Sequence, residues 1–381
     1  MIYLNNAATS YPKPECVRLR AAASLAAPPD EAGRSTRGES EIEGCRRHGA
    51  AFFNAPAPEK FIFTSGATFA LNMAIRGLHR GKKNRFITTE TEHNSVLRPL
   101  YHLKEERGIH IDFMTCDREG RINPGDIKKL ITPETAGAVI THGSNVTGAV
   151  HDIRELSRYT RAADIPLVVD AAQTAGLIPV DMRDLGIDIL VFTGHKYLFG
   201  TSGTGGLILG ENIDLPPLIT GGTGSMSQSL LQPSFYPVLL EAGTPNETGI
   251  KSLDSGLSYI ESIGFDEIMR RSRELRRQLI AGLSRISGVS IHAPAPSDPG
   301  TVLPLLSITI SDGLGSDPAE AGYILHKSYE IVVRTGLHCA PLIHRRLGTH
   351  PAGTVRVSPG IFTNSGEIET FIKAVSAIAA G

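Results

Sequence analysis

The feature that most constrains the fold is an alternation of short apolar runs with longer helix-like segments, which extends from about residue 60 to residue 210. The apolar runs read FIFTS, RFITTE, AGAVITHGS, IPLVVDAAQ and DILVFTGHK. Continuously apolar strands separated by helices are typical of a parallel sheet that is covered on both faces. The pattern therefore predicts an α/β domain with a predominantly parallel sheet.

A second pattern follows this region. Long amphipathic helical segments, including 266–286, precede a Pro/Ser/Gly-rich turn at 293–301. Apolar runs at 305–310 and 329–336 read as strands, and 366–380 reads as a closing helix, which together predict a smaller α+β unit. We expect a large domain of residues 14–255 and a small domain formed by 1–13 and 256–381.

Composition excludes several classes of protein. The 41% hydrophobic and 20% charged residues are those of a globular chain, and 38 basic residues nearly balance 39 acidic ones, so we expect no binding to nucleic acid or an anionic membrane. The N-terminus has no leader-like pattern, and no apolar run approaches the roughly 18 residues of a membrane span. The cysteines are widely separated and form no C-x-x-C pair, which argues against a disulfide framework and a zinc site. A cytoplasmic location fits best.

Polar residues directly after the apolar runs are candidates for a binding site, because ligands of open α/β sheets lie beyond the carboxyl ends of the strands. Residues 65–68, SGAT, lie at a predicted strand-to-helix turn, where backbone N–H groups could hold a phosphate or where the turn could be an ordinary helix cap. His93 and Asn145 end two further strands and could be structural or functional.

Asp170 and Lys196 carry the strongest local signals. Asp170 ends an apolar strand, with Gln173 three residues later, and burial of its charge is costly without a cation or donors. Lys196 follows another buried strand and precedes a predicted glycine-rich loop. Desolvation would free its amine for Schiff-base chemistry, although a lysine that extends to solvent would look the same. No G-x-G-x-x-G, P-loop or H-E-x-x-H motif is present.

Together these strand ends suit pyridoxal phosphate. Lys196 could bind its aldehyde, and Asp170 could keep its ring nitrogen protonated. Gln173 could donate to the ring oxygen and His93 could stack on the ring, while Thr68, Thr193 and His195 could contact the phosphate.

The chain also resembles the class V aminotransferases of fold type I, and most nearly the SufS-like cysteine desulfurases. Matching segments occur in order along almost the whole sequence: YLNNAATSYPKP, FTSGAT, TEHNS, THGSNVTG, VVDAAQ, FTGHKYLFG, EAGTPN, RTGLHCAP and VRVSPGIFTN. The resemblance implies a large domain with a mostly parallel, seven-stranded type of sheet. Asn5, Ala67 and Leu337 stand where relatives commonly carry aspartate, threonine and histidine, respectively.

The resemblance also implies roles for individual residues. Lys196, Asp170, Gln173 and His93 match cofactor-binding positions, and His93 and Lys196 are expected to be catalytic as well. Phosphate contacts are implied for Ala67, Thr68, Thr193 and His195, and Asn145 is expected at the cofactor and the substrate. Thr244 matches a residue that reaches the phosphate of a neighbouring subunit, which implies a homodimer. Arg356 matches the arginine that binds the substrate carboxylate, and Cys339 the cysteine that takes the sulfur.

The implied reaction converts L-cysteine to L-alanine. Lys196 would remove the α-proton as general base, and the Cys339 thiolate would attack the substrate sulfur to form a persulfide. Arg334 or a protonated His338 would favour the thiolate. The sulfur would pass to an acceptor protein, and iron–sulfur cluster assembly is the family's usual setting.

Two alternatives remain open at this point. The same cofactor and lysine would serve an aminotransferase, a selenocysteine lyase or a β-elimination lyase, which need no persulfide on Cys339. A non-catalytic scaffold or sulfur-relay protein could retain the fold, although the presence of Lys196, Asp170, Arg356 and Cys339 argues against it.

Overall fold

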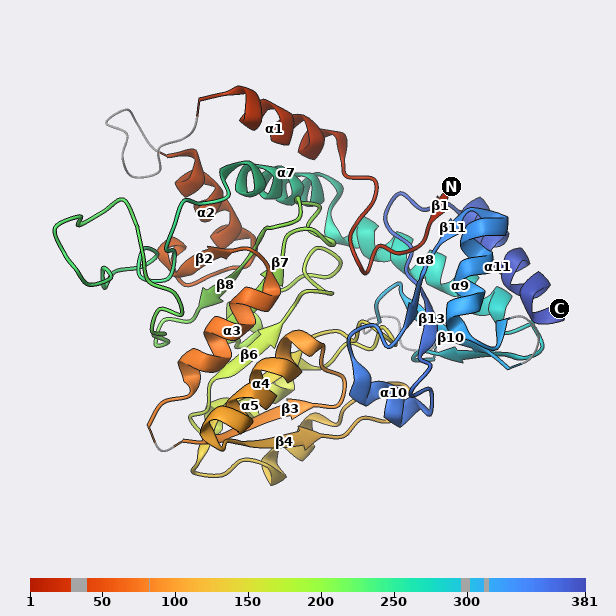
Figure 1. The fold of residues 1–381 in the computed structure, drawn as a ribbon, viewed down its shortest axis with the longest axis horizontal. Coiled ribbons are helices and arrows are strands. Elements are labelled where there is room, and N and C mark those ends of the chain that lie inside the picture. Colours follow the sequence, from red (N-terminus) through yellow and green to blue (C-terminus); the bar gives the residue numbers. More distant parts are fainter. Residues whose placement is uncertain (29–39, 82, 296–301, 312–314) are drawn as a thin grey trace.

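The computed structural model describes residues 1–28, 40–81, 83–295, 302–311 and 315–381, and its described strands form sheets of seven, four and two strands (Figure 1). In the seven-stranded sheet, β8 is antiparallel to both its neighbours and the other pairings are parallel. The prediction of a large, mostly parallel sheet is confirmed. Its strands, in spatial order, are β2 (Phe61–Thr64), β8 (Gly205–Leu209), β7 (Ile189–Thr193), β6 (Leu167–Asp170), β5 (Thr135–Thr141), β3 (Arg85–Thr89) and β4 (His110–Met114).

Helices cover both faces of this sheet. α3 (Ala67–Leu78) and α4 (Asn94–Arg107) pack on one face, where Val168 and Val191 are among the buried strand residues. α2 (Glu41–Phe52), α5 (Ile153–Ala162) and α7 (Glu247–Ile263) pack on the other, against residues that include Leu167 and Val169. Because successive strand residues face opposite sides, both sides of β6 must be apolar, which explains its unbroken hydrophobic sequence. Two further helices are α1 (Glu15–Ala26) and α6 (Met182–Leu185).

The glycine-rich stretch after Lys196 is a loop, as predicted, only as far as Thr204. Residues 205–209 form β8, which lies between β2 and β7. A Cβ atom on Gly205 would lie 2.6 Å from the Gly66 Cα and 2.7 Å from the Phe192 carbonyl oxygen, so only glycine fits this backbone contact. The contact brings β8 against the turn between β2 and α3, which the sequence pattern had marked as a candidate phosphate site.

The four-stranded sheet is antiparallel. It contains β12 (Arg334–Gly336), β13 (Thr354–Val357), β10 (Leu306–Ile310) and β9 (Val289–His292). The closing helix is confirmed as α11 (Ser365–Ala380), and α8 (Phe265–Leu283) and α9 (Pro318–Tyr329) pack on the same core. The short helix α10 (Pro341–Leu347) follows β12 along the chain. The greater part of the predicted turn, residues 296–301, lies outside the described residues.

The predicted strand at 329–336 is divided in two. β11 (Ile331–Val332) pairs with the N-terminal strand β1 (Ile2–Tyr3), whereas β12 pairs with β13 in the four-stranded sheet. The two pieces therefore belong to different sheets, which a continuous apolar pattern does not reveal. The β1–β11 pairing holds the N-terminus beside the C-terminal elements (Figure 1). The division into residues 14–255 on one side and 1–13 with 256–381 on the other stays a prediction. No helix among the described residues is long and apolar enough to cross a membrane.

We expect Gly205→Ala to lower the free energy of unfolding by about 2 kcal/mol, because the new methyl group must displace backbone atoms rather than a flexible side chain. Chemical denaturation would measure the change. Gly221→Ala is the control, since a methyl group added there would meet nothing within 4 Å. Equal stability of the two variants would contradict the proposed close contact between β8 and the β2–α3 turn.

Candidate active site

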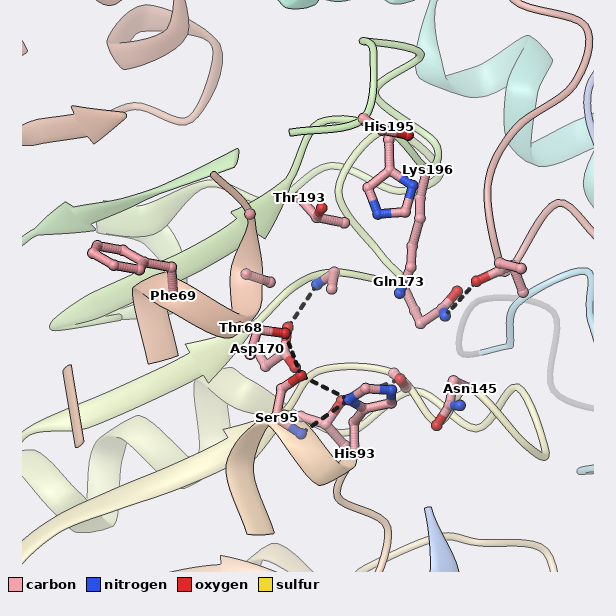
Figure 2. A pocket seen from close by; sticks show the side chains of 18 of the residues that line it. Thr68, Phe69, His93, Ser95, Asn145, Asp170, Gln173, Thr193, His195 and Lys196 are labelled. Atoms are coloured by element: carbon pink, nitrogen blue, oxygen red, sulfur yellow. Dashed lines mark hydrogen bonds between the residues drawn. The ribbon is translucent and has the colours of Figure 1, made fainter. Parts of the chain in front are cut away.

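A cavity of about 360 Å³ lies at the carboxyl ends of the parallel strands. The predicted site residues converge on it from segments far apart in the sequence, with His195 and Lys196 on the side opposite His93 and Ser95 (Figure 2). Cys339 and Thr244 are predicted site residues that do not line this cavity. Those that line it are Ala67, Thr68, His93, Asn145, Asp170, Gln173, Thr193, His195, Lys196 and Arg356.

Lys196 and Asp170 occupy adjacent strand ends within this cavity. Asp170 is the last residue of β6 and is 4% exposed, and its Oδ1 accepts the Ala172 N–H at 2.9 Å. Burial raises the pKa of Asp170, against the opposing effects of that hydrogen bond and of Lys196. Burial also lowers the pKa of Lys196 to about 8, with Asp170 opposing the shift. The cavity thus holds a lysine that is partly neutral near physiological pH.

The backbone beside Lys196 is held by the N-terminal segment. The His195 carbonyl oxygen accepts hydrogen bonds from Thr9 Oγ1 at 2.9 Å and from Lys13 Nζ at 2.6 Å. On the same side of the cavity, Gln173 Nε2 donates to the Ala7 carbonyl at 3.0 Å. Residues near the start of the chain therefore position the loop that presents Lys196, which local sequence patterns do not predict.

Two polar atoms of this part of the site lack partners. Gln173 Oε1 and His195 Nδ1 are buried without a hydrogen bond among the described residues. Burial lowers the pKa of His195 to about 4, so its ring is neutral at pH 7. Buried polar atoms normally have partners, and orphaned ones at a cavity indicate where a polar ligand would bind.

His93 is held by the first turn of α4. Its Nδ1 accepts the Ser95 N–H at 3.0 Å and lies 2.9 Å from Ser95 Oγ, which in turn lies 2.7 Å from Thr68 Oγ1 (Figure 2). Because Nδ1 accepts a backbone hydrogen bond, the ring proton belongs on Nε2. Burial lowers the pKa of His93 to about 3, so the ring is neutral. Ser95 was not among the predicted site residues, although its place two residues into a predicted helix was a usable signal.

The SGAT turn connects β2 to α3, as its sequence predicts. Gly66 is the N-cap of α3 with φ of 147° and makes no side-chain cap hydrogen bond. The first N–H groups of α3 therefore have no capping side chain, and they form the partial positive end of the helix dipole. This arrangement is suited to an anion, with Ala67, Thr68 and Thr193 along the same wall of the cavity.

Arg356, on β13, reaches the cavity from the four-stranded sheet. Its Nη1 donates to the Asn145 carbonyl at 3.0 Å and its Nη2 to Asn5 Oδ1 at 3.2 Å. Nε has no partner among the described residues, and the side chain is fully buried. Burial lowers the pKa of Arg356 to about 10, which leaves it charged at neutral pH. A buried guanidinium with an unused N–H is a binding point for an anionic group.

Cys339 lies in a tight turn held from two sides. Asn145 Nδ2 donates to the His338 carbonyl at 2.7 Å, and the Asn94 N–H donates to the Cys339 carbonyl at 2.6 Å. His338 and Cys339 have φ values of 50° and 60°, which are uncommon for residues other than glycine and cluster at functional sites. Arg334 Nη2 donates to Cys339 Sγ at 3.1 Å, so a cation does contact the sulfur.

The alternative that a protonated His338 assists Cys339 is wrong. His338 Nε2 lies 2.9 Å from Thr354 Oγ1, and the side chain is 2% exposed. Burial holds its pKa well below the ordinary value, so the imidazole is neutral. Sequence proximity alone could not distinguish His338 from Arg334, because the unusual backbone of the turn decides which of them faces the sulfur.

The remaining predicted residue, Thr244, is exposed and lines a separate cavity of about 310 Å³. This cavity shares Ser65, Phe69 and Gly203 with the cavity at Lys196. The contact of Thr244 with the phosphate of a neighbouring subunit stays a prediction.

The chain was compared with protein families, with individual relatives and with solved structures. The family model for class V aminotransferases matches residues 2–371. A probable cysteine desulfurase of Methanothermobacter thermautotrophicus is 31% identical over 91% of this chain and 85% of its own length. The apo structure of a cysteine desulfurase from Thermococcus onnurineus has a TM-score of 0.91 and 30% identity over 100% of this chain and 95% of that one.

A second solved structure, the cysteine desulfurase CsdA of Escherichia coli, has a TM-score of 0.88 and 25% identity over 99% of this chain and 94% of that one. The family match covers nearly the whole sequence, and the structural matches cover 99–100% of the chain. The chain belongs to the class V aminotransferase family and, within it, to the cysteine desulfurases.

Proposed function

We propose that the protein converts L-cysteine to L-alanine with pyridoxal 5'-phosphate as cofactor, and that Cys339 receives the sulfur. The observation that carries this proposal is the guanidinium of Arg334 at 3.1 Å from Cys339 Sγ, beside a cavity that contains a buried lysine and a buried carboxylate. A cation in contact with a thiol favours the thiolate, which is the nucleophilic form.

The chemistry of the cavity fits the cofactor. The uncapped start of α3 with Thr68, Thr193 and His195 would hold the phosphate, and Asp170 would bind the protonated ring nitrogen. Gln173 has a second amide N–H for the ring oxygen, and the neutral ring of His93 would stack on the cofactor ring. When bound, pyridoxal phosphate supplies an electron-withdrawing ring that stabilises negative charge at the substrate α-carbon.

The residues of this chain would perform the remaining steps. Arg356 would bind the substrate carboxylate through its free N–H, while Asn145 fixes the guanidinium from the other side. Lys196 would bind the cofactor aldehyde and, once released by substrate, would accept the α-proton as a neutral amine. The Cys339 thiolate would attack the substrate sulfur, so that the sulfur–carbon bond breaks as a sulfur–sulfur bond forms.

We further propose that the active protein is a homodimer. Thr244 and the cavity that it lines adjoin the cavity at Lys196 through Ser65, Phe69 and Gly203. A residue of a second subunit placed in this opening would come close to the start of α3.

We also propose that the sulfur received by Cys339 passes from it to an acceptor.

Cys339→Ser should lower sulfide release from L-cysteine by at least about 100-fold while the visible absorbance of the bound cofactor remains, because only the nucleophile is lost. Sulfide and alanine should be measured together, so that an aminotransferase would be recognised by its keto-acid product. The exposed Cys16 provides the control substitution. Normal sulfide release by Cys339→Ser would exclude the proposed role.

Arg356→Gln should weaken binding of L-cysteine by about 100-fold, because the carboxylate loses a charged hydrogen-bond donor. Spectral titration with L-cysteine and with its methyl ester would measure the effect. The wild-type protein should prefer the free acid, and the variant should bind the two ligands alike. A variant that keeps this preference would show that another group binds the carboxylate.

The amine of Lys196 should titrate near pH 8 in the cofactor-free protein, below the ordinary lysine range, because burial disfavours its charged form. Reductive methylation with isotope-labelled formaldehyde, followed by NMR across a pH series, would measure the midpoint. Asp170 raises the pKa of Lys196, so Asp170→Asn should move the midpoint to lower pH. A midpoint near 10.5 in the wild-type protein would contradict the proposed general base.

A further inference from the structure

Cys339 lines a second cavity, of about 370 Å³, rather than the one that contains Lys196. The two cavities share Thr68, His93 and Ser95, so their walls meet at the neutral imidazole. Arg334 lines the first cavity and donates to Cys339 Sγ. The reactive sulfur can therefore be approached from a side that does not pass Lys196.

The second cavity is bounded by α3 and α4 and has a basic rim. Arg98 and His102 lie one helical turn apart on α4 and are both exposed, whereas the helix residue Pro99 between them is buried. The described residues that line the cavity include no aspartate or glutamate: they are Thr68, Asn72, His93, Asn94, Ser95, Arg98, Pro99, His102 and Cys339.

The charge of Arg98 is uncompensated within the part of the chain that the structure describes, where no ion pair involves this residue. The positive charge of Arg98 acts on His93, in the wall that the two cavities share, because Arg98 is among the cations that lower the pKa of His93. An exposed cation beside a cavity whose described lining has no carboxylate attracts anionic ligands and raises their association rate.

We propose that this second cavity admits the sulfur acceptor, and that Arg98 with His102 selects acceptor thiols that carry a carboxylate close to the sulfur. The inference rests on the proposed function, since it requires a persulfide on Cys339. The acceptor thiolate attacks the outer sulfur of this persulfide. A new sulfur–sulfur bond forms on the acceptor, the old one breaks, and Cys339 leaves as a thiolate that Arg334 stabilises. No external oxidant or reductant is needed.

The test measures discharge of the persulfide separately from its formation. Holoenzyme is loaded with L-cysteine, freed of excess substrate, and mixed with 3-mercaptopropionate, 2-mercaptoethanol or cysteamine, while intact mass reports the persulfide over time. Arg98→Gln should slow discharge by 3-mercaptopropionate about fivefold and change the rate with neutral 2-mercaptoethanol much less. Cysteamine, which is cationic, should discharge the variant faster than the wild type.

Each acceptor is compared with itself in the wild-type and variant proteins, so differences in thiol reactivity cancel. Arg98→Lys keeps the charge and should keep the preference. Arg107→Gln removes an exposed cation from the same helix, outside the cavity lining, and should leave all three rates unchanged. Two peptides with cysteine between glutamates or between glutamines extend the test to a protein segment. A discharge rate that depends on the glutamates of the peptide indicates a protein acceptor. An effect of Arg98→Gln that is confined to 3-mercaptopropionate indicates a small-molecule thiol acceptor.

The proposal is overturned if Arg98→Gln changes discharge by all acceptors equally, or by none. Absence of alanine and of persulfide in the loading step would instead show that the proposed function has failed, before any acceptor is added. The exposed position of Arg98 makes its substitution compatible with folding, and unchanged thermal unfolding would verify this in each variant.

Discussion

Asn145 connects the seven-stranded sheet to the four-stranded sheet, and both sheets contribute residues to the site. It follows β5 of the seven-stranded sheet, and its carbonyl oxygen accepts from Arg356 Nη1 while its amide nitrogen donates to the His338 carbonyl. One residue therefore fixes the guanidinium of β13 and the turn that carries Cys339. Both bonds are buried, and a buried donor or acceptor left without its partner costs about 1–3 kcal/mol, so the arrangement resists sliding of one sheet against the other.

Burial also determines the charge of the site. Lys196, Arg334 and Arg356 bring positive charge to the cavity, where Asp170 is the carboxylate among the described lining residues. The histidines around it do not add to this charge, because burial lowers the pKa of His93, His195 and His338. Where Arg356 meets Asn5, the amide accepts a hydrogen bond without neutralising the guanidinium. The cavity is thus electrostatically suited to anionic ligands, such as a phosphate and a substrate carboxylate.

Much of the large sheet could be predicted because its strands have a strong local signal. Both faces of β5, β6 and β7 are buried, so these strands are continuously apolar, and the polar residue at each strand end is conspicuous. β8 could not be recognised in the same way. Its glycines resemble a loop in isolation, and their purpose is visible only when Gly205 is seen against the backbone of Gly66 and Phe192. The division of 329–336 between two sheets had no local signal either.

The sequence by itself determined the types of chemical group and their order along the chain. Asp170 and Lys196 were found because a charged residue after a buried strand stands out locally, and Arg356 and Cys339 because they lie in motifs that resemble those of the family. Only the tertiary structure decided which of these groups meet. Arg334 rather than His338 contacts the sulfur, and Cys339 lines a cavity with Arg98 that shares the wall at His93 with the cavity of Lys196. These choices depend on the positive φ angles of the turn and on hydrogen bonds to Asn94 and Asn145. Contacts between residues so distant in sequence are determined by the packing of the elements against one another, and a local sequence pattern does not contain this information.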